Sequence, residues 1–205
     1  MLNVLLAGVG GQGTVLAAKV LASAAQSKRW AVRTAETIGM AQRGGSVVSH
    51  VRMASQGEEL YASLVTPGTA DLIVAFEPGE AARALPYLSR SGTVVTARTT
   101  VQPVTAALAG APYDGAAVIG ALRSALADQA PAARLVAVDD AAVTTAVGTS
   151  RVLNMALLGA ALATGGFPLA LDDLREAVRA CVKPQFVALN LAAIDEAARQ
   201  AAALG

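Results

Sequence analysis

The chain has 205 residues, a length that suits a single domain over residues 1–205. Its 16 Lys and Arg side chains against 15 Asp and Glu give a net charge of +1, and only 3% of its residues are aromatic. This composition argues against a nucleic-acid-binding protein, because it predicts neither a basic surface nor aromatic platforms for base stacking. The hydrophobic share of 54% is high enough that we expect a partner subunit to cover part of the surface.

The sequence predicts no signal peptide and no membrane-spanning segment. The first apolar run is broken by glycines within a few residues, and the run from Val152 to Leu171 contains Gly165-Gly166 and Pro168. The single cysteine, Cys181, allows no internal disulfide and no iron–sulfur cluster held by this chain, since such clusters take several thiolates. We therefore expect a cytoplasmic protein with no membrane contact and no metal site of its own.

The start of the chain reads as strand, glycine turn and helix. Asn3–Ala7 is a short apolar run, and Thr14–Ala25 consists of good helix formers. Glycines between them allow a tight turn and the close approach of a phosphate to the backbone, where the free N–H groups of the helix start point at an anion. The alternative is a tight turn that binds nothing. The candidate phosphate-binding residues of this turn are Gly8, Gly10, Gly11, Gln12 and Gly13.

Trp30–Glu36 is predicted as a second strand. In a dinucleotide-binding unit an acidic residue at its end would bond the ribose hydroxyls, and Glu36 has about the required position. A glycine-rich loop, Thr37–Ser46, follows where a helix would be expected, and Arg43 lies within it. Backbone N–H groups and a guanidinium can together hold a phosphate or a carboxylate. We favour this reading over a plain connection.

The next predicted strand is Val47–Met53, in which Val47, Ser49, Val51 and Met53 share one face. His50 lies on the other face, and no cysteine, serine or carboxylate motif partners it, so we interpret it as structural. Glu58–Leu64 is predicted as a further edge element.

The rest of the chain continues the alternation of strands and helices. We predict strands at Asp71–Phe76, Thr93–Ala97 and Leu135–Val138, and helices at Glu80–Leu88 (kinked or ended by Pro86), Ala116–Ala127, Ala141–Val147, Arg151–Ala163, Leu171–Ala180 and Gln185–Ala203, with Pro103–Pro112 a loop or a broken helix. This pattern predicts an α/β fold, a Rossmann-like doubly wound and mostly parallel sheet with C-terminal helices. It leaves the strand order open.

The segment Arg151–Ala163 is apolar nearly all round, with Asn154 as its main polar interruption. A helix without a polar face is buried, either in the core of its own chain or under another chain. Both alternatives stay open from the sequence.

The motifs of a complete active site are missing. There is no Walker lysine motif, no His/Cys metal cluster, no nucleophile elbow and no segment of the kind that holds thiamine diphosphate. We therefore predict no catalytic residue in this chain and interpret it as a binding or assembly subunit.

Three segments together resemble a known family. They are GVGGQG at Gly8–Gly13, ETIGMAQRGGSVVSHVR at Glu36–Arg52 and RVLNMALLGA at Arg151–Ala160. They resemble the gamma-domain, or small-subunit, family of the 2-oxoacid:ferredoxin oxidoreductases over almost the whole chain. Within it, the beta subunits of indolepyruvate ferredoxin oxidoreductases are most similar in length and motif order.

The resemblance implies an oxidoreductase subunit that is inactive alone. Such enzymes oxidatively decarboxylate a 2-oxoacid, here expected to be an arylpyruvate, to an acyl-coenzyme A while reducing ferredoxin. The large partner subunit carries thiamine diphosphate and iron–sulfur clusters, and the domain corresponding to this chain helps to bind coenzyme A. On this analogy the residues of the glycine turn, Gly8, Gly10, Gly11, Gln12 and Gly13, either hold an anionic phosphate or brace the turn. The residues that would bind cofactor, line the crevice or meet the large subunit are then Met40, Gln42, Arg43, Gly44, Gly45, Ser46, Glu36 and Asn154.

One residue departs from the family pattern. Close relatives often have histidine where this chain has Ile38, so a contact made by that histidine would be absent and the choice of substrate is left open. Two alternatives to the subunit interpretation are a stand-alone NAD(P)-binding oxidoreductase that uses Gly8–Gly13 and Glu36, and a nucleotide-sensing module. The loop after Glu36 and the absence of a catalytic set argue against hydride transfer. If the glycine turn holds a phosphate ligand, the resemblance implies coenzyme A rather than NAD.

Overall fold

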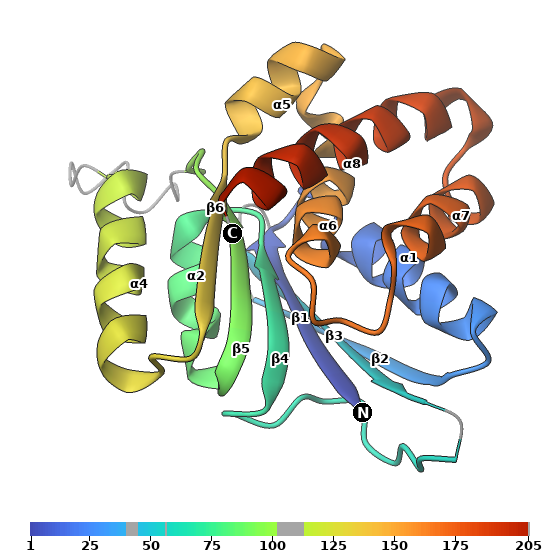
Figure 1. Cartoon of the computed structure of the whole chain (residues 1–205), viewed down its shortest axis with the longest axis horizontal. Helices are drawn as coiled ribbons and strands as arrows, with labels where there is room; N and C mark the ends of the chain where they lie inside the picture. The colour runs from blue at the N-terminus through green and yellow to red at the C-terminus, as the bar shows by residue number, and fades with distance from the viewer. Residues whose placement is uncertain (40–44, 56, 102–112, 205) are drawn as a thin grey trace.

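The computed structural model describes residues 1–39, 45–55, 57–101 and 113–204. Within these ranges, six strands form a mixed sheet in the order β2-β3-β1-β4-β5-β6 (Figure 1). The strands are β1 (Leu2–Val9), β2 (Ala31–Ile38), β3 (Ser46–Ala54), β4 (Ala70–Ala75), β5 (Leu88–Ala97) and β6 (Arg134–Val138). Strands β1, β4, β5 and β6 run parallel, whereas β3 is antiparallel to both β1 and β2.

Helices cover both faces of the sheet, which confirms the predicted doubly wound α/β fold. One face carries α1 (Thr14–Ser27), α6 (Leu153–Ala163), α7 (Leu171–Cys181) and α8 (Pro184–Leu204). The other carries α2 (Pro78–Ala84) and α4 (Gly115–Gln129), while α5 (Asp140–Val147) lies beyond the end of β6 (Figure 1). Short 3-10 turns, η1 (Leu85–Tyr87) and η2 (Ser150–Val152), precede β5 and α6.

None of the described helices is by itself long and apolar enough to cross a membrane. The segments Asp140–Val147 and Ser150–Ala163 reach that length and composition only when taken together, as a pair bent by 117°.

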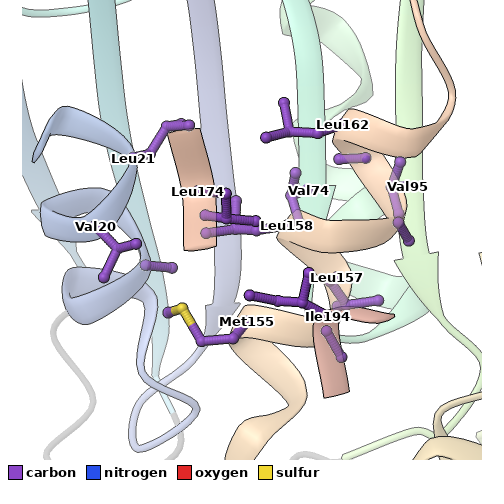
Figure 2. Packing of buried hydrophobic residues seen from close by; sticks show 14 of the residues in the cluster. Val20, Leu21, Val74, Val95, Met155, Leu157, Leu158, Leu162, Leu174 and Ile194 are labelled. Carbon is purple, nitrogen blue, oxygen red and sulfur yellow. The ribbon is translucent and has the colours of Figure 1, made fainter. Parts of the chain in front are cut away.

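The apolar helix α6 is buried within this chain rather than under another one. Met155, Leu157 and Leu158 have no exposed surface, and Figure 2 shows them among side chains from the sheet, α1, α7 and α8. A helix covered on every side needs no polar face, which explains the sequence of α6.

The position of β2 differs from that in a dinucleotide-binding unit. There the second strand lies parallel beside the first, but here β3 takes that place and β2 pairs antiparallel with β3 at the edge of the sheet. The connection between β2 and β3 is short, so it can join antiparallel strands but is too short for a parallel crossover. Most residues of β2 are consequently exposed.

The prediction of an edge element at Glu58–Leu64 is wrong. This segment is neither helix nor strand. Its carbonyl oxygens accept hydrogen bonds from arginine side chains rather than from the backbone of a neighbouring strand. Arg33 Nε donates to Leu60 O (3.4 Å), and an Arg52 guanidinium nitrogen donates to Ala62 O (3.0 Å).

Three element boundaries also differ from the prediction. The helix predicted over Glu80–Leu88 starts two residues earlier and ends at Ala84, because Pro86 allows only the 3-10 turn η1 there, and β5 begins at Leu88 rather than at Thr93. The predicted loop or broken helix at Pro103–Pro112 lies outside the described residues. The other predicted helices and strands are confirmed to within a few residues.

Candidate functional site

The side chain of Gln12 holds the glycine turn between β1 and α1 from within. Gln12 Oε1 accepts a hydrogen bond from the Val9 backbone N–H (2.7 Å), and Gln12 Nε2 donates to Phe76 O (3.2 Å) at the end of β4. Gly11 and Gly13 have φ angles of 100° and 81°, a conformation that favours glycine. The amide of Gln12 therefore braces the turn and links the ends of β1 and β4.

Gly8 is required by close packing under the turn. A Cβ atom at this position would lie 2.7 Å from the Phe76 ring and 2.9 Å from Gln12 Oε1. A Cβ at Gly11, in contrast, would meet nothing within 4 Å. Gly8 therefore packs inside the fold, whereas Gly11 has no close neighbour among the described residues and lines a pocket.

Among the described residues, no side chain caps the N-terminus of α1. Its N-cap is Gly13, which offers no side-chain cap, and its first turn contains no acidic residue. The first N–H groups of a helix have no partner within it and carry a partial positive charge, so they favour an anion. The start of α1 is thus suited to a phosphate or carboxylate.

Asn154 ties α6 to the same turn. Its side chain is buried, Asn154 Nδ2 donates to Gly13 O (3.2 Å), and Asn154 Oδ1 accepts from the Met155 backbone N–H (2.9 Å). The polar interruption in the apolar helix therefore has a specific partner 141 residues away in the sequence.

A pocket of about 450 Å³ opens beside the turn. It lies at the carboxyl ends of the parallel strands, where ligands of open α/β sheets bind. Its lining combines the turn, the start of α1, the segments after β4, β5 and β6, and the start of α6: Gly11, Gln12, Gly13, Leu16, Phe76, Thr99, Val101, Asp140, Ser150, Arg151, Leu153 and Asn154.

The pocket is lined by one basic and one acidic residue, Arg151 and Asp140, and the acidic one accepts hydrogen bonds from backbone donors. Arg151, an exposed residue, lines this pocket together with Gly13 and Leu16 at the start of α1. The carboxylate of Asp140 is occupied, since its Oδ1 accepts from the Arg98 and Thr99 backbone N–H groups, at 2.9 Å each. The described residues contain no group of three or more His, Cys, Asp or Glu that could hold a metal ion.

A second cavity, of about 460 Å³, lies at the opposite edge of the sheet and is lined by Trp30, Arg134 and Phe167 among others. It is slightly larger but contains no part of the glycine turn. We place the candidate site at the carboxyl ends of the strands because the start of α1, the glycine turn and Arg151 all line the pocket there.

The predicted site residues fall into separate groups. Gly11, Gln12, Gly13 and Asn154 meet in the pocket. Gly10 N–H donates to Gly45 O (3.0 Å), so the residue before β3 contacts the turn. Ser46 instead points to α2, where its hydroxyl donates to a carboxylate oxygen of Glu80 (2.5 Å).

Glu36 and the neighbouring Ile38 are exposed on β2, and neither lines the pocket. Ile38 has 69% of its surface exposed. The other predicted loop residues, Met40, Gln42, Arg43 and Gly44, lie outside the described residues.

Sequence reasoning missed four polar residues of the pocket. Thr99 and Asp140 each lie two residues past the ends of β5 and β6. The carboxyl ends of parallel strands meet at one edge of a sheet, so the end of each predicted strand was a usable signal. Ser150 and Arg151 precede α6 by a few residues, and only the packing of that helix brings them to the turn.

His50 is buried on the other face of the sheet, away from the pocket. Its Nδ1 accepts a hydrogen bond from the Val65 backbone N–H (3.2 Å), and its ring contacts the edge of Tyr87 with centroids 6.0 Å apart. Burial lowers the pKa of the imidazole below its ordinary value of 6.5. These contacts give His50 a structural environment.

The buried imidazole predicts a pH dependence of stability. The unfolded chain binds a proton on His50 at a higher pH than the folded chain does, so its contribution is present above pH 6.5 and is lost as the pH falls through the folded pKa. Urea denaturation at about pH 7.5 and about pH 5 measures this loss. His50→Gln, which keeps an acceptor for Val65 but cannot take up the proton, should lose less stability between the two conditions than the native chain. Equal losses in both proteins would contradict the assignment.

Comparisons with known proteins agree with this architecture. The model of the pyruvate ferredoxin/flavodoxin oxidoreductase family matches residues 3–200. Indolepyruvate oxidoreductase subunit IorB of Pyrococcus horikoshii is 35% identical over 193 residues, covering 94% of this chain and 92% of that protein. The IorB subunit of Methanothermobacter thermautotrophicus is 34% identical over 194 residues, with 95% and 94% covered.

Solved structures show the same fold. The gamma subunit of a keto/oxoacid ferredoxin oxidoreductase from Geobacter sulfurreducens superposes with a TM-score of 0.70 at 21% identity, with 99% of each chain covered. The 2-oxoglutarate:ferredoxin oxidoreductase from Magnetococcus marinus, a structure with coenzyme A bound, gives a TM-score of 0.72 at 20% identity, with 100% of this chain and 31% of that chain covered. From the family match and the identities to the archaeal subunits, the chain belongs to the pyruvate ferredoxin/flavodoxin oxidoreductase family, as a small subunit of the kind those archaeal proteins represent.

Proposed function

We propose that this chain is the small subunit of an enzyme that oxidatively decarboxylates an arylpyruvate, such as indolepyruvate, to an acyl-coenzyme A and passes the electrons to ferredoxin. The names of its curated relatives support the substrate class. Ile38 is exposed and does not line the pocket, so we assign the choice among 2-oxoacids to the assembled enzyme.

The chemistry of decarboxylation belongs to a large partner subunit in this proposal. One cysteine cannot hold an iron–sulfur cluster, and the sequence has no segment of the kind that holds thiamine diphosphate. We assign both groups, and the contact with ferredoxin, to the partner in a cytoplasmic complex.

Coenzyme A is the ligand proposed for the pocket of this chain. The observation that carries this is the N-terminus of α1, which has no side-chain cap among the described residues and lines one cavity together with Gly11 and Arg151. Phosphate groups suit such a combination of backbone N–H donors and a cation. The Magnetococcus structure, which has coenzyme A bound and shares this fold over 31% of its chain, supports this choice of ligand.

The arrangement of the sheet disfavours the NAD(P) alternative. In a dinucleotide-binding unit the acidic residue on the second strand is one strand away from the glycine turn. Here β3 lies between β1 and β2, so Glu36 is two strand spacings from β1, roughly 10 Å. A nucleotide bound at the turn therefore lacks the ribose contact that the motif requires.

Co-expression with the large thiamine-dependent subunit tests the proposal. We expect the two chains to co-purify and to reduce ferredoxin with an arylpyruvate only when coenzyme A is present. Arg151→Ala should raise the KM for coenzyme A about tenfold, the effect of losing one charge-assisted hydrogen bond.

Arg90→Ala is the matched control, because Arg90 is exposed near the start of β5, at the opposite edge of the sheet. It should leave the KM unchanged. Chains that do not associate would refute the subunit assignment, and an active complex whose KM ignores Arg151 would refute the placement of coenzyme A.

A further inference from the structure

Two buried glutamates stand at the start of α2, and each has two partners. Glu77 and Glu80 are both only 2% exposed. Glu80 accepts a hydrogen bond from the Ser46 hydroxyl (2.5 Å) and pairs with the guanidinium of Arg83. Glu77 caps α2 by accepting from the Glu80 backbone N–H (2.7 Å), and its other oxygen accepts from the Tyr113 hydroxyl (2.5 Å).

This network reaches the glycine turn through the start of β3. Ser46 is the first residue of β3, and the carbonyl of its neighbour Gly45 accepts the hydrogen bond from Gly10 N–H (3.0 Å). A continuous path therefore runs from the glycine turn through Gly45 and Ser46 to Glu80 on α2.

The other end of the network holds the segment before α4. The Tyr113 hydroxyl also accepts from the Gly79 backbone N–H (2.6 Å). Burial and the hydrogen bond to Glu77 raise the pKa of the Tyr113 phenol above its ordinary value, so the hydroxyl stays a donor to that carboxylate.

Glu80 is not needed to cap its own helix. Glu77 already satisfies the N–H of Glu80, while both carboxylate oxygens of Glu80 are directed to side chains, Ser46 and Arg83. A buried carboxylate is costly unless it is paired and hydrogen-bonded. Its partners thus indicate a role in joining α2 to the start of β3.

We propose that Glu80, held by Arg83, is a positioning residue that acts through Ser46 to hold Gly45 against Gly10 and thereby sets the shape of the glycine turn. Because that turn forms one wall of the pocket, this inference rests on the proposed function for its effect on coenzyme A. The positioning itself does not depend on the ligand.

Two measurements separate the two claims. Amide hydrogen exchange of the full chain, followed residue by residue by NMR, reports the Gly10 N–H directly, and the KM for coenzyme A of the co-expressed complex reports the pocket. Ser46→Ala and Glu80→Gln should each speed exchange at Gly10 about tenfold and raise the KM several-fold, since each leaves a buried polar group without its partner.

Rescue and control variants exclude a general loss of stability. Ser46→Thr keeps the hydroxyl and should restore both readouts. Ser27→Ala removes a hydroxyl that donates to Ala24 O (2.8 Å) at the far end of α1, and should change neither. Glu80→Gln keeps the shape of the side chain, so it serves if Ser46→Ala does not fold.

Unchanged exchange at Gly10 in the Ser46 and Glu80 variants would overturn the positioning role, as would a failure of threonine to restore it. Faster exchange at Gly10 with an unchanged KM would support the positioning role and would instead overturn the placement of coenzyme A at the turn.

Discussion

Leu158→Ala is expected to lower the free energy of unfolding by about 3–4 kcal/mol, the usual cost of a cavity left by a buried leucine. Leu158 has no exposed surface and belongs to the apolar cluster that also contains Val74 of β4 and Leu174 of α7 (Figure 2). Because α6 is enclosed by its own chain, little of this cavity can collapse.

Leu189→Ala is the matched control on α8, where this leucine is 38% exposed. It should cost less than about 1 kcal/mol, since much of its side chain already contacts water. Urea denaturation followed by circular dichroism measures both values. Similar losses for the two variants would show that α6 is not in the core of the isolated chain.

Gly159→Ala is expected to destabilise the fold by about 2 kcal/mol, although alanine favours a helix more than glycine does. A Cβ at Gly159 would lie 2.8 Å from Ile194 O and 2.9 Å from Ile194 Cα. Backbone atoms of α8 cannot move aside as a flexible side chain can, so the crossing of α6 and α8 must widen.

Gly120→Ala, also in a helix, is expected to raise the free energy of unfolding rather than lower it. Gly120 is exposed in α4, and a Cβ there would meet nothing within 4 Å. Alanine should stabilise the chain by up to about 1 kcal/mol through helix propensity alone. The two variants should therefore shift the denaturation midpoint in opposite directions, and a stabilising Gly159→Ala would disprove the close crossing.

The candidate site was partly predictable from sequence. The glycine turn could be recognised because its residues are contiguous and its chemistry is local: a tight turn, a close approach and a free helix end. The contributions of Asp140 and Arg151 depend on which strands and helices converge at one edge. The role of Glu80 depends on a contact with Ser46 across 34 residues of sequence, which no local pattern contains.

The sequence by itself determined the alternation of strands and helices, the glycine turn and the apolar character of α6, because hydrophobic periodicity and glycine placement act over a few neighbouring residues. Only the tertiary structure decided that β3 separates β2 from β1 and that α6 is buried by α1, α7 and α8. Strand order and helix burial depend on which distant apolar faces pack together, and the short β2–β3 connection makes antiparallel pairing the accessible solution. That arrangement moves Glu36 away from the glycine turn and leaves the pocket to Asn154 and Arg151 of the C-terminal half.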